Sequence, residues 1–209
     1  MKFILLVEGD TEKLAIAEFL KKWLDPQLTT RVGIKVVNFH GNAQLVRKVV
    51  AKAQDYLDGP DSNEIIAVIG LLDLYGLDMY PAGLTAAKDR HDWGVKHFEG
   101  QVSRDRFRMF FAVHEFEAWI LGQPDVLPRP VQDALPKTIA NPEKVDFDEP
   151  PAKLLDRLYL SQMRKSYKKT TYGKQLFGRL GPDVVAAKCP YLKAMLTKML
   201  TLAKAAGLG

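Results

Sequence analysis

The sequence of 209 residues predicts an α/β fold, in which a mainly parallel sheet carries helices on both faces and a basic helical lobe follows at the C-terminus. Two observations predict it. Short apolar runs alternate with helical patterns up to residue 122, with short connections between most of them. Beyond residue 152 only helical patterns follow, and basic residues outnumber acidic ones there. Repeated strand–helix–strand units favour parallel strands with right-handed crossovers.

The first unit starts with residues 3–7, an apolar run that is too short and continuous for a surface helix and therefore predicts a buried strand. Glu8 follows directly, so its carboxylate is expected at the carboxyl edge of the sheet, where open α/β sheets bind ligands. Gly9-Asp10 is a turn and helix-start signal. Residues 11–24 then show apolar side chains at helical spacing until Asp25-Pro26 ends the pattern.

The next elements repeat this order. Residues 33–39 alternate and are rich in β-branched side chains, which predicts a strand, and residues 43–57 follow with helical spacing. The run 64–73 is apolar almost throughout and predicts a strand that is buried on both faces. Like the first strand, it ends on an acid, Asp73.

The last unit of the sheet is less regular. A long connection leads to a polar, helical stretch through residues 88–98, and residues 107–113 predict a fourth strand. That strand also runs into acids, Glu115 and Glu117. Three of the predicted strands therefore deliver carboxylates to one edge of the sheet.

We expect three parts in the chain. An α/β domain spans residues 1–122, a proline-rich connector spans 123–151, and a basic helical segment over 152–209 packs on the domain. The connector shows little hydrophobic periodicity, which is typical of an irregular segment. Within the last part, a basic loop over 164–174 interrupts the helical patterns.

The charge of the chain is divided unevenly. Residues 1–152 hold 18 Lys and Arg against 23 Asp and Glu, whereas residues 153–209 hold 12 against 2. A carboxylate-rich body beside a strongly basic segment suits a protein that holds a cation next to a polyanion, with a solubilising lysine-rich surface as the alternative. The residues expected to contact nucleic acid are Arg164, Lys165, Tyr167, Lys168, Lys169 and Lys174.

Composition limits the classes of site and location that we expect. The chain has one cysteine and four scattered histidines, so a disulfide and a cysteine-based zinc site are not expected. No apolar stretch is long enough to cross a bilayer, and the start of the chain is too short for a signal peptide. The sequence thus favours a cytoplasmic protein whose metal ligands, where it has any, are oxygen atoms.

Glu8 and Asp73 are the first pair of carboxylates that could share a cation. Neighbouring parallel strands lie about 4.8 Å apart, so the two side chains meet where their strands are adjacent. Mg²⁺ and Mn²⁺ prefer such oxygen ligands and are commonly held by one or two carboxylates together with a substrate phosphate. Glu12, one helical turn beyond Glu8, and Glu115 or Glu117 could complete a second position.

Two of these segments resemble the motifs of a known fold. The segment Val7-Glu8-Gly9-Asp10-Thr11-Glu12 is similar to the glutamate motif of toprim domains, and Leu72-Asp73 after a buried strand is similar to their aspartate motif. Toprim is the metal-binding fold of topoisomerases, primases and the overcoming-lysogenization-defect nucleases. The resemblance implies a toprim-like α/β fold for this chain.

Other segments resemble a small bacterial toprim-like family, domain of unknown function 4276, whose members resemble a detached nuclease half that often has an ATPase partner. They are Asp73-Leu74-Tyr75-Gly76-Leu77, His114-Glu115-Phe116-Glu117-Ala118-Trp119, Pro150-Pro151-Ala152-Lys153 and Tyr167-Lys168-Lys169-Thr170. This resemblance covers nearly the whole chain. It implies a Mg²⁺- or Mn²⁺-dependent nuclease that hydrolyses phosphodiester bonds and works with an ATPase in a defence or DNA-processing system.

The resemblance also implies roles for single residues. Glu8 would position a metal or act as general base on the attacking water, with Asp73 and one of Glu115 and Glu117 as further ligands. Lys168 or Lys169 would add positive charge at the transition state, with a solvated loop position as the alternative for each lysine. The partners expected are nucleic acid, DNA rather than RNA, an ATPase and a second copy of the chain in a homodimer, with no membrane.

One position departs from the toprim pattern. Toprim domains usually carry a second aspartate two residues after the first, and here that position is Tyr75, which cannot replace a carboxylate ligand. The departure favours an alternative from another class, a non-catalytic module that binds a metal, nucleic acid or an ATPase. A third alternative is an enzyme that acts on the phosphates of nucleotides, although the basic segment carries more charge than a small substrate requires.

Overall fold

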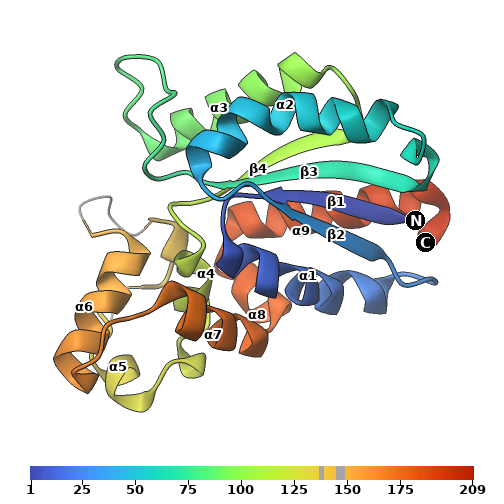
Figure 1. Cartoon of the computed structure of the whole chain (residues 1–209). Helices are drawn as coiled ribbons and strands as arrows, with labels where there is room; N and C mark the ends of the chain where they lie inside the picture. The colour runs from blue at the N-terminus through green and yellow to red at the C-terminus, as the bar shows by residue number, and fades with distance from the viewer. Residues whose placement is uncertain (137–138, 145–148) are drawn as a thin grey trace.

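The computed structural model describes residues 1–136, 139–144 and 149–209, without the side chains of residues 10–14 and 170. A four-stranded sheet lies at its centre, with the strand order β2-β1-β3-β4 and parallel pairing throughout (Figure 1). The predicted fold class is therefore confirmed. The strands are β1 (Lys2–Val7), β2 (Gly33–Asn38), β3 (Ile65–Asp73) and β4 (Phe107–Ala112).

β3 is one of the two interior strands, and all nine of its residues are buried. A strand in this position is covered by helices on both faces, which explains why its sequence is an unbroken apolar run. In the register, Val7 at the end of β1 pairs with Leu71 of β3, and Asp73 pairs with Ala112 of β4. The carboxyl ends of these three strands thus lie at one edge of the sheet.

Helices cover both faces of the sheet. The helices α2 (Asn42–Asp58) and α3 (Ala87–Val102) lie on one face, and α1 (Asp10–Leu24) and α9 (Pro190–Ala203) lie on the other (Figure 1). Side chains alternate along β1 accordingly, since Ile4 and Leu6 join the core under α2 and α3 while their neighbours join the second core. The C-terminal helix therefore completes a layer that the N-terminal helix begins.

The other helices gather beside α1, beyond one end of the sheet (Figure 1). Aromatic side chains join this group to the rest of the molecule, since Phe177 stacks on Phe116 at 4.2 Å between ring centroids and Phe19 of α1 stacks on Trp119 at 5.8 Å. The division of the chain at residues 122 and 152 stays a prediction. The helices are α4 (Glu117–Gly122), α5 (Arg129–Asp133), α6 (Pro151–Met163), α7 (Lys174–Arg179) and α8 (Pro182–Ala186).

The basic loop expected over residues 164–174 is shorter than predicted. A single π-helical turn spans Lys169–Gly173 and leads directly into α7. Only Leu176 and Phe177 of the six residues in α7 are buried, so the segment is too short to show helical periodicity in the sequence. Among the described residues, no helix has the length and apolar character needed to span a membrane.

Candidate functional site

The carboxyl edge of β1 and β3 positions the first two predicted site residues. Glu8 follows Val7 directly, and Asp73 is the last residue of β3. The backbone N–H of Gly41 donates to the carbonyl oxygen of Glu8 at 2.6 Å, so the connection from β2 to α2 lies at this edge too. Glu8 is half-buried and Asp73 is only 8% exposed.

The side chain of Asp73 holds the segment that follows β4. Its Oδ1 accepts a hydrogen bond of 2.9 Å from the backbone N–H of Phe116. The residues after Asp73 also pair with this segment, since the N–H of Tyr75 donates to the carbonyl oxygen of His114 at 2.9 Å. These two hydrogen bonds fix the backbone on either side of Glu115, and they bring the acids after β4 to the end of β3.

Glu115 and Glu117 are both buried, with 8% and 3% of their surface exposed. Oε2 of Glu115 accepts a hydrogen bond of 2.9 Å from the backbone N–H of Ala152, in the first turn of α6. This contact joins the segment after β4 to the N-terminus of α6. Burial raises the pKa of Glu117, and the positive charge of Lys169 opposes that rise.

Lys169 supplies the positive charge between these acids. Its Nζ lies 3.1 Å from Oε2 of Glu117 and 3.8 Å from Oε1 of Glu115. Burial disfavours the ammonium, but the carboxylates of Glu117, Asp73 and Glu115 outweigh it and raise the pKa of Lys169. The side chain keeps 46% of its surface accessible, so part of Lys169 is open to solvent.

Carboxylate oxygens are the main polar groups of this cluster. Asp73, Glu115 and Glu117 are three buried acids, and Lys169 contacts two of them, Glu115 and Glu117. Mg²⁺ and Mn²⁺ prefer carboxylate oxygens as ligands, so the donor set fits these ions in its chemistry. Within the described part of the chain, however, no three His, Cys, Asp or Glu side chains converge closely enough to hold a metal ion.

Tyr167 lies in the same cluster and is buried, with 7% of its surface exposed. Its ring contacts the ring of Tyr159 at 5.4 Å between centroids, and its N–H donates to Oδ1 of Asp156 at 2.8 Å. Burial, followed by the charges of Glu117 and other neighbours, raises the pKa of its hydroxyl, which has no hydrogen-bond partner among the described residues. The ring of Tyr167 is thus buried, whereas stacking on a nucleic-acid base would require it at the surface.

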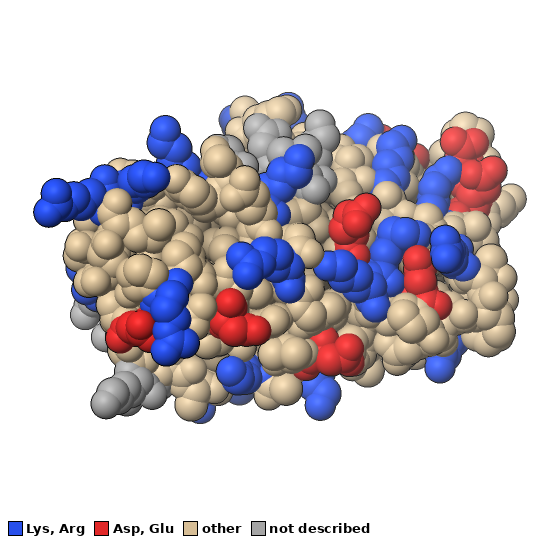
Figure 2. Space-filling view, turned by 90° about the horizontal axis from the view of Figure 1, so that it is seen from below, with Lys and Arg blue, Asp and Glu red and all other residues tan. Residues whose placement is uncertain are grey.

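The structure separates the basic residues predicted around this segment. Lys169 contacts the carboxylates of Glu115 and Glu117. Lys168 is exposed, and it belongs to none of the ion pairs found among the described residues. Lysine and arginine side chains are spread over the face seen from below, with fewer acidic ones among them (Figure 2). The other exposed basic residues around Lys169 are Arg164, Lys165 and Lys174.

Glu12 belongs to α1, but its side chain lies outside the described residues, so its role as a ligand stays a prediction. His114 is 3% exposed and directly precedes Glu115, between the end of β4 and the start of α4. The partners that sequence reasoning missed are backbone N–H groups, those of Phe116 and Ala152, which no side-chain pattern reveals.

The fold and this cluster define an α/β protein with buried acids at the carboxyl edge of a parallel sheet. A family model described as a domain of unknown function, DUF4276, matches residues 7–200. The chain therefore belongs to that family, as its sequence motifs predicted.

Two solved structures are similar to this chain over nearly its whole length. The C-terminal region of the Xanthomonas campestris pv. campestris OLD protein is 19% identical, and the match covers 96% of this chain and 93% of that chain with a TM-score of 0.48. The C-terminal region of the Burkholderia pseudomallei OLD protein is 18% identical, with 98% of each chain covered and a TM-score of 0.48. No curated protein matches the chain.

Proposed function

We propose that this protein is a Mg²⁺- or Mn²⁺-dependent nuclease that hydrolyses phosphodiester bonds in nucleic acid. One observation carries the proposal. Buried acids gather at the ends of two neighbouring strands, Asp73 from β3 and Glu115 and Glu117 after β4, and the last two contact Lys169, which is partly open to solvent. Buried carboxylate oxygens beside a partly accessible lysine suit a site that binds a metal ion and then a phosphate.

The proposed hydrolysis gives a role to each residue of the cluster. Glu8, Asp73 and one of Glu115 and Glu117 would hold the metal, which when bound supplies Lewis-acid stabilisation of the phosphate oxygens. As the alternative to holding the metal, the carboxylate of Glu8 would take a proton from the attacking water, which its half-buried position allows. The ammonium of Lys169 would stabilise the negative charge that develops on the phosphate.

The proposed substrate is a polymer because of the surface beside the cluster. The segment from Arg164 to Lys174 carries exposed basic residues on both sides of Lys169 in the sequence. A phosphate held at Lys169 would place neighbouring phosphates of the same strand against this segment. DNA rather than RNA, an ATPase partner, a homodimer, cytoplasmic action and a role in defence or DNA processing complete the proposal. Of these, the ATPase partner and the role in defence or DNA processing rest on the family resemblance.

A non-catalytic module is the second candidate, and Lys169 is the observation that favours it. Its ammonium already pairs with Glu117 and Glu115, so part of the buried charge is balanced without a metal. Tyr75 stands where toprim domains usually carry a second aspartate, and its backbone N–H is used to hold the chain at His114. Such a module would bind a metal, nucleic acid or an ATPase without cleaving anything.

Cleavage by matched variants separates the two candidates. Supercoiled plasmid, single-stranded DNA and RNA are incubated with the protein in Mg²⁺, Mn²⁺ or a chelator. We expect metal-dependent cleavage by the wild type and a loss of at least about a hundredfold in Glu8→Gln and Asp73→Asn. Asp105→Asn is the matched control, because this exposed aspartate precedes β4 at the opposite edge of the sheet. Equal behaviour of all four proteins would contradict the nuclease proposal.

A further inference from the structure

A pocket of about 500 Å³ opens between the start of α2 and the loop that follows β3. We call it the edge pocket. Its apolar walls belong to the core under α2 and α3, since Leu77 is part of that core and Val46 and Met79 pack against it. The residues that line it are Asn42, Ala43, Val46, Arg47, Gly76, Leu77, Asp78 and Met79.

The edge pocket adjoins the carboxylate cluster through both of its walls. Gly76 lies three residues after Asp73, a length of chain that spans at most about 11 Å. On the other wall, Asn42 follows Gly41, whose N–H donates to the carbonyl oxygen of Glu8 at 2.6 Å. The side-chain amide of Asn42 donates to the carbonyl oxygen of Gly76 at 3.3 Å and so joins the two walls. The pocket and the cluster therefore occupy the same edge of the sheet.

The lining of the edge pocket combines two kinds of surface. Four side chains are apolar, those of Ala43, Val46, Leu77 and Met79. The polar side chains are an amide, a guanidinium and a carboxylate, from Asn42, Arg47 and Asp78. Together they can donate and accept hydrogen bonds around an apolar slot. A volume of this size is ordinary for a ligand pocket and exceeds what a single planar ring system needs.

A nucleobase matches this lining better than a phosphate does. Its two faces are apolar, while its rim carries both hydrogen-bond donors and acceptors. The carboxylate of Asp78 would repel a phosphate, but it can accept hydrogen bonds from the exocyclic amino group of a base. The base must be unpaired, because a base within a duplex has both faces stacked and its pairing edge used.

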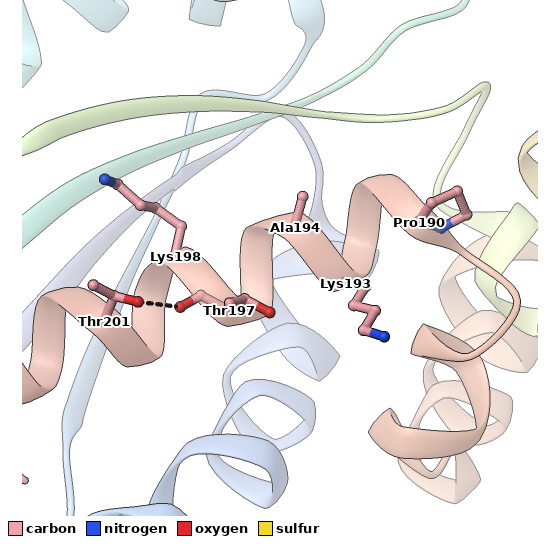
Figure 3. Close-up of a pocket in the computed structure, with 6 residues that line it drawn as sticks. All are labelled: Pro190, Lys193, Ala194, Thr197, Lys198 and Thr201. Carbon is pink, nitrogen blue, oxygen red and sulfur yellow. Dashed lines mark hydrogen bonds between the residues drawn. The ribbon is translucent and has the colours of Figure 1, made fainter.

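A second hollow lies along the outer side of α9, but it has no comparable construction. Its six lining residues, labelled in Figure 3, all come from that one helix. Lys193 and Lys198 extend from it in different directions (Figure 3). Among the residues that the structure describes, no second element lines this groove with polar groups, so it offers no construction that selects a ligand.

We propose that the edge pocket binds one unpaired nucleobase of the strand whose phosphate lies at the carboxylate cluster. This inference rests on the proposed function and adds a specificity site to it. The protein would then bind single strands, or duplex ends that fray, more tightly than intact duplex of the same length.

Binding without cleavage tests the pocket. Fluorescence anisotropy measures the affinity of the Asp73→Asn variant for a labelled single-stranded oligonucleotide and for a set in which one abasic site is moved along the strand. We expect one position at which loss of the base weakens binding by at least about fivefold, since a base held on protein side chains contributes that much or more. Equal affinity for every member of the set would overturn the proposal.

Two variants and a control assign that effect to the edge pocket. Ala43→Phe fills the pocket from α2, and Met79→Ala removes part of the opposite wall, so each should abolish the difference between intact and abasic strands. Ala51→Phe makes the same change at an exposed position of α2 outside the pocket and should keep the difference. A persistent difference in both pocket variants would refute the assignment.

The outcomes also separate this inference from the proposed function. Selective loss of affinity with an abasic site, in a wild type that cleaves nothing, would support the edge pocket and contradict the nuclease. Metal-dependent cleavage together with equal binding of intact and abasic strands would support the nuclease and contradict the pocket.

Discussion

At the scale of single residues, the cluster depends on one lysine that balances more than one acid. Lys169 contacts both Glu115 and Glu117, and Glu117 is almost fully buried. Removal of one partner from a buried ion pair is costly because the other charge is left without compensation. The cost is reduced here, since nearly half of the lysine surface is accessible to water.

Lys169→Met should therefore lower the free energy of unfolding by about 1–2 kcal/mol at pH 7, measured by urea denaturation. Combining it with Glu117→Gln should recover most of that loss, because the buried charge is then removed as well. Lys168→Met is the control, since Lys168 is exposed, and its effect should stay within about 0.5 kcal/mol. An equal loss of unfolding free energy in Lys169→Met and Lys168→Met would show that the ion pair does not stabilise the protein.

Glu143 is a second buried acid, and sequence reasoning did not single it out. It is 3% exposed, and its two carboxylate oxygens accept hydrogen bonds from the N–H groups of Tyr191 and Leu192, at 2.8 and 3.1 Å. These donors belong to the first turn of α9, so Glu143 caps the helix that completes one face of the sheet. Burial nevertheless outweighs these bonds and raises the pKa of Glu143 to about 7.

This raised pKa predicts a pH dependence of stability. Because the folded state binds the proton more tightly than the unfolded state, the contribution is fully present below pH 4.5 and is lost as the pH rises through about 7. Between pH 5 and 8 the wild type should lose about 2–3 kcal/mol more than Glu143→Gln, in urea titrations at each pH. Parallel pH profiles for the two proteins would contradict this assignment.

At the scale of elements, the strands and long helices were predictable because each has a strong period in the sequence. The run of β3 is apolar over nine residues, and α2 buries one side chain in every turn. The helices α4 and α7 have six residues each, which is too short for a period to show. Their positions depend on tertiary contacts, such as the stacking of Phe116 on Phe177.

The packing of α3 on β4 can be tested with two glycines of the same helix. A Cβ atom at Gly94 would lie 2.6 Å from Cζ of Phe111, whereas a Cβ atom at Gly100 would meet nothing within 4 Å. Gly94→Ala should lower the free energy of unfolding by about 1–3 kcal/mol, because the ring of Phe111 has to move. Gly100→Ala should raise it by up to about 1 kcal/mol through helix propensity alone. A higher melting temperature for Gly94→Ala than for Gly100→Ala would refute this account.

At the scale of the whole molecule, the sequence revealed which acids share an edge but not how they are held. Three strand ends that carry acids predict a cluster as soon as the strands are parallel, and the order β1-β3-β4 makes them neighbours. The role of Lys169 was not separable from that of Lys168, since adjacent residues in a loop look alike until the fold orients them. Backbone donors such as the N–H of Ala152 carry no sequence signal at all.

The uneven charge of the chain makes a prediction about nucleic-acid binding at this scale. Residues 153–209 hold 12 basic and 2 acidic residues, yet only part of that charge lies beside the carboxylate cluster. If the strand runs along the segment that contains Lys169, then the basic residues of that segment should release counterions on binding. The lysines just before α9, within α9 and in the turn that follows it should contribute far less.

Two variants with equal net charge test this distribution. Neutralising Arg164, Lys165, Lys168 and Lys174 should weaken binding to single-stranded DNA, and it should reduce the slope of log K against log salt by about 0.7 for each phosphate that is no longer neutralised. Neutralising Lys188, Lys193, Lys198 and Lys204 removes the same charge from the other side of the basic segment, and it should leave the slope nearly unchanged. Equal slopes in both variants would mean that net charge alone drives binding, and the strand would then have no fixed path past Lys169.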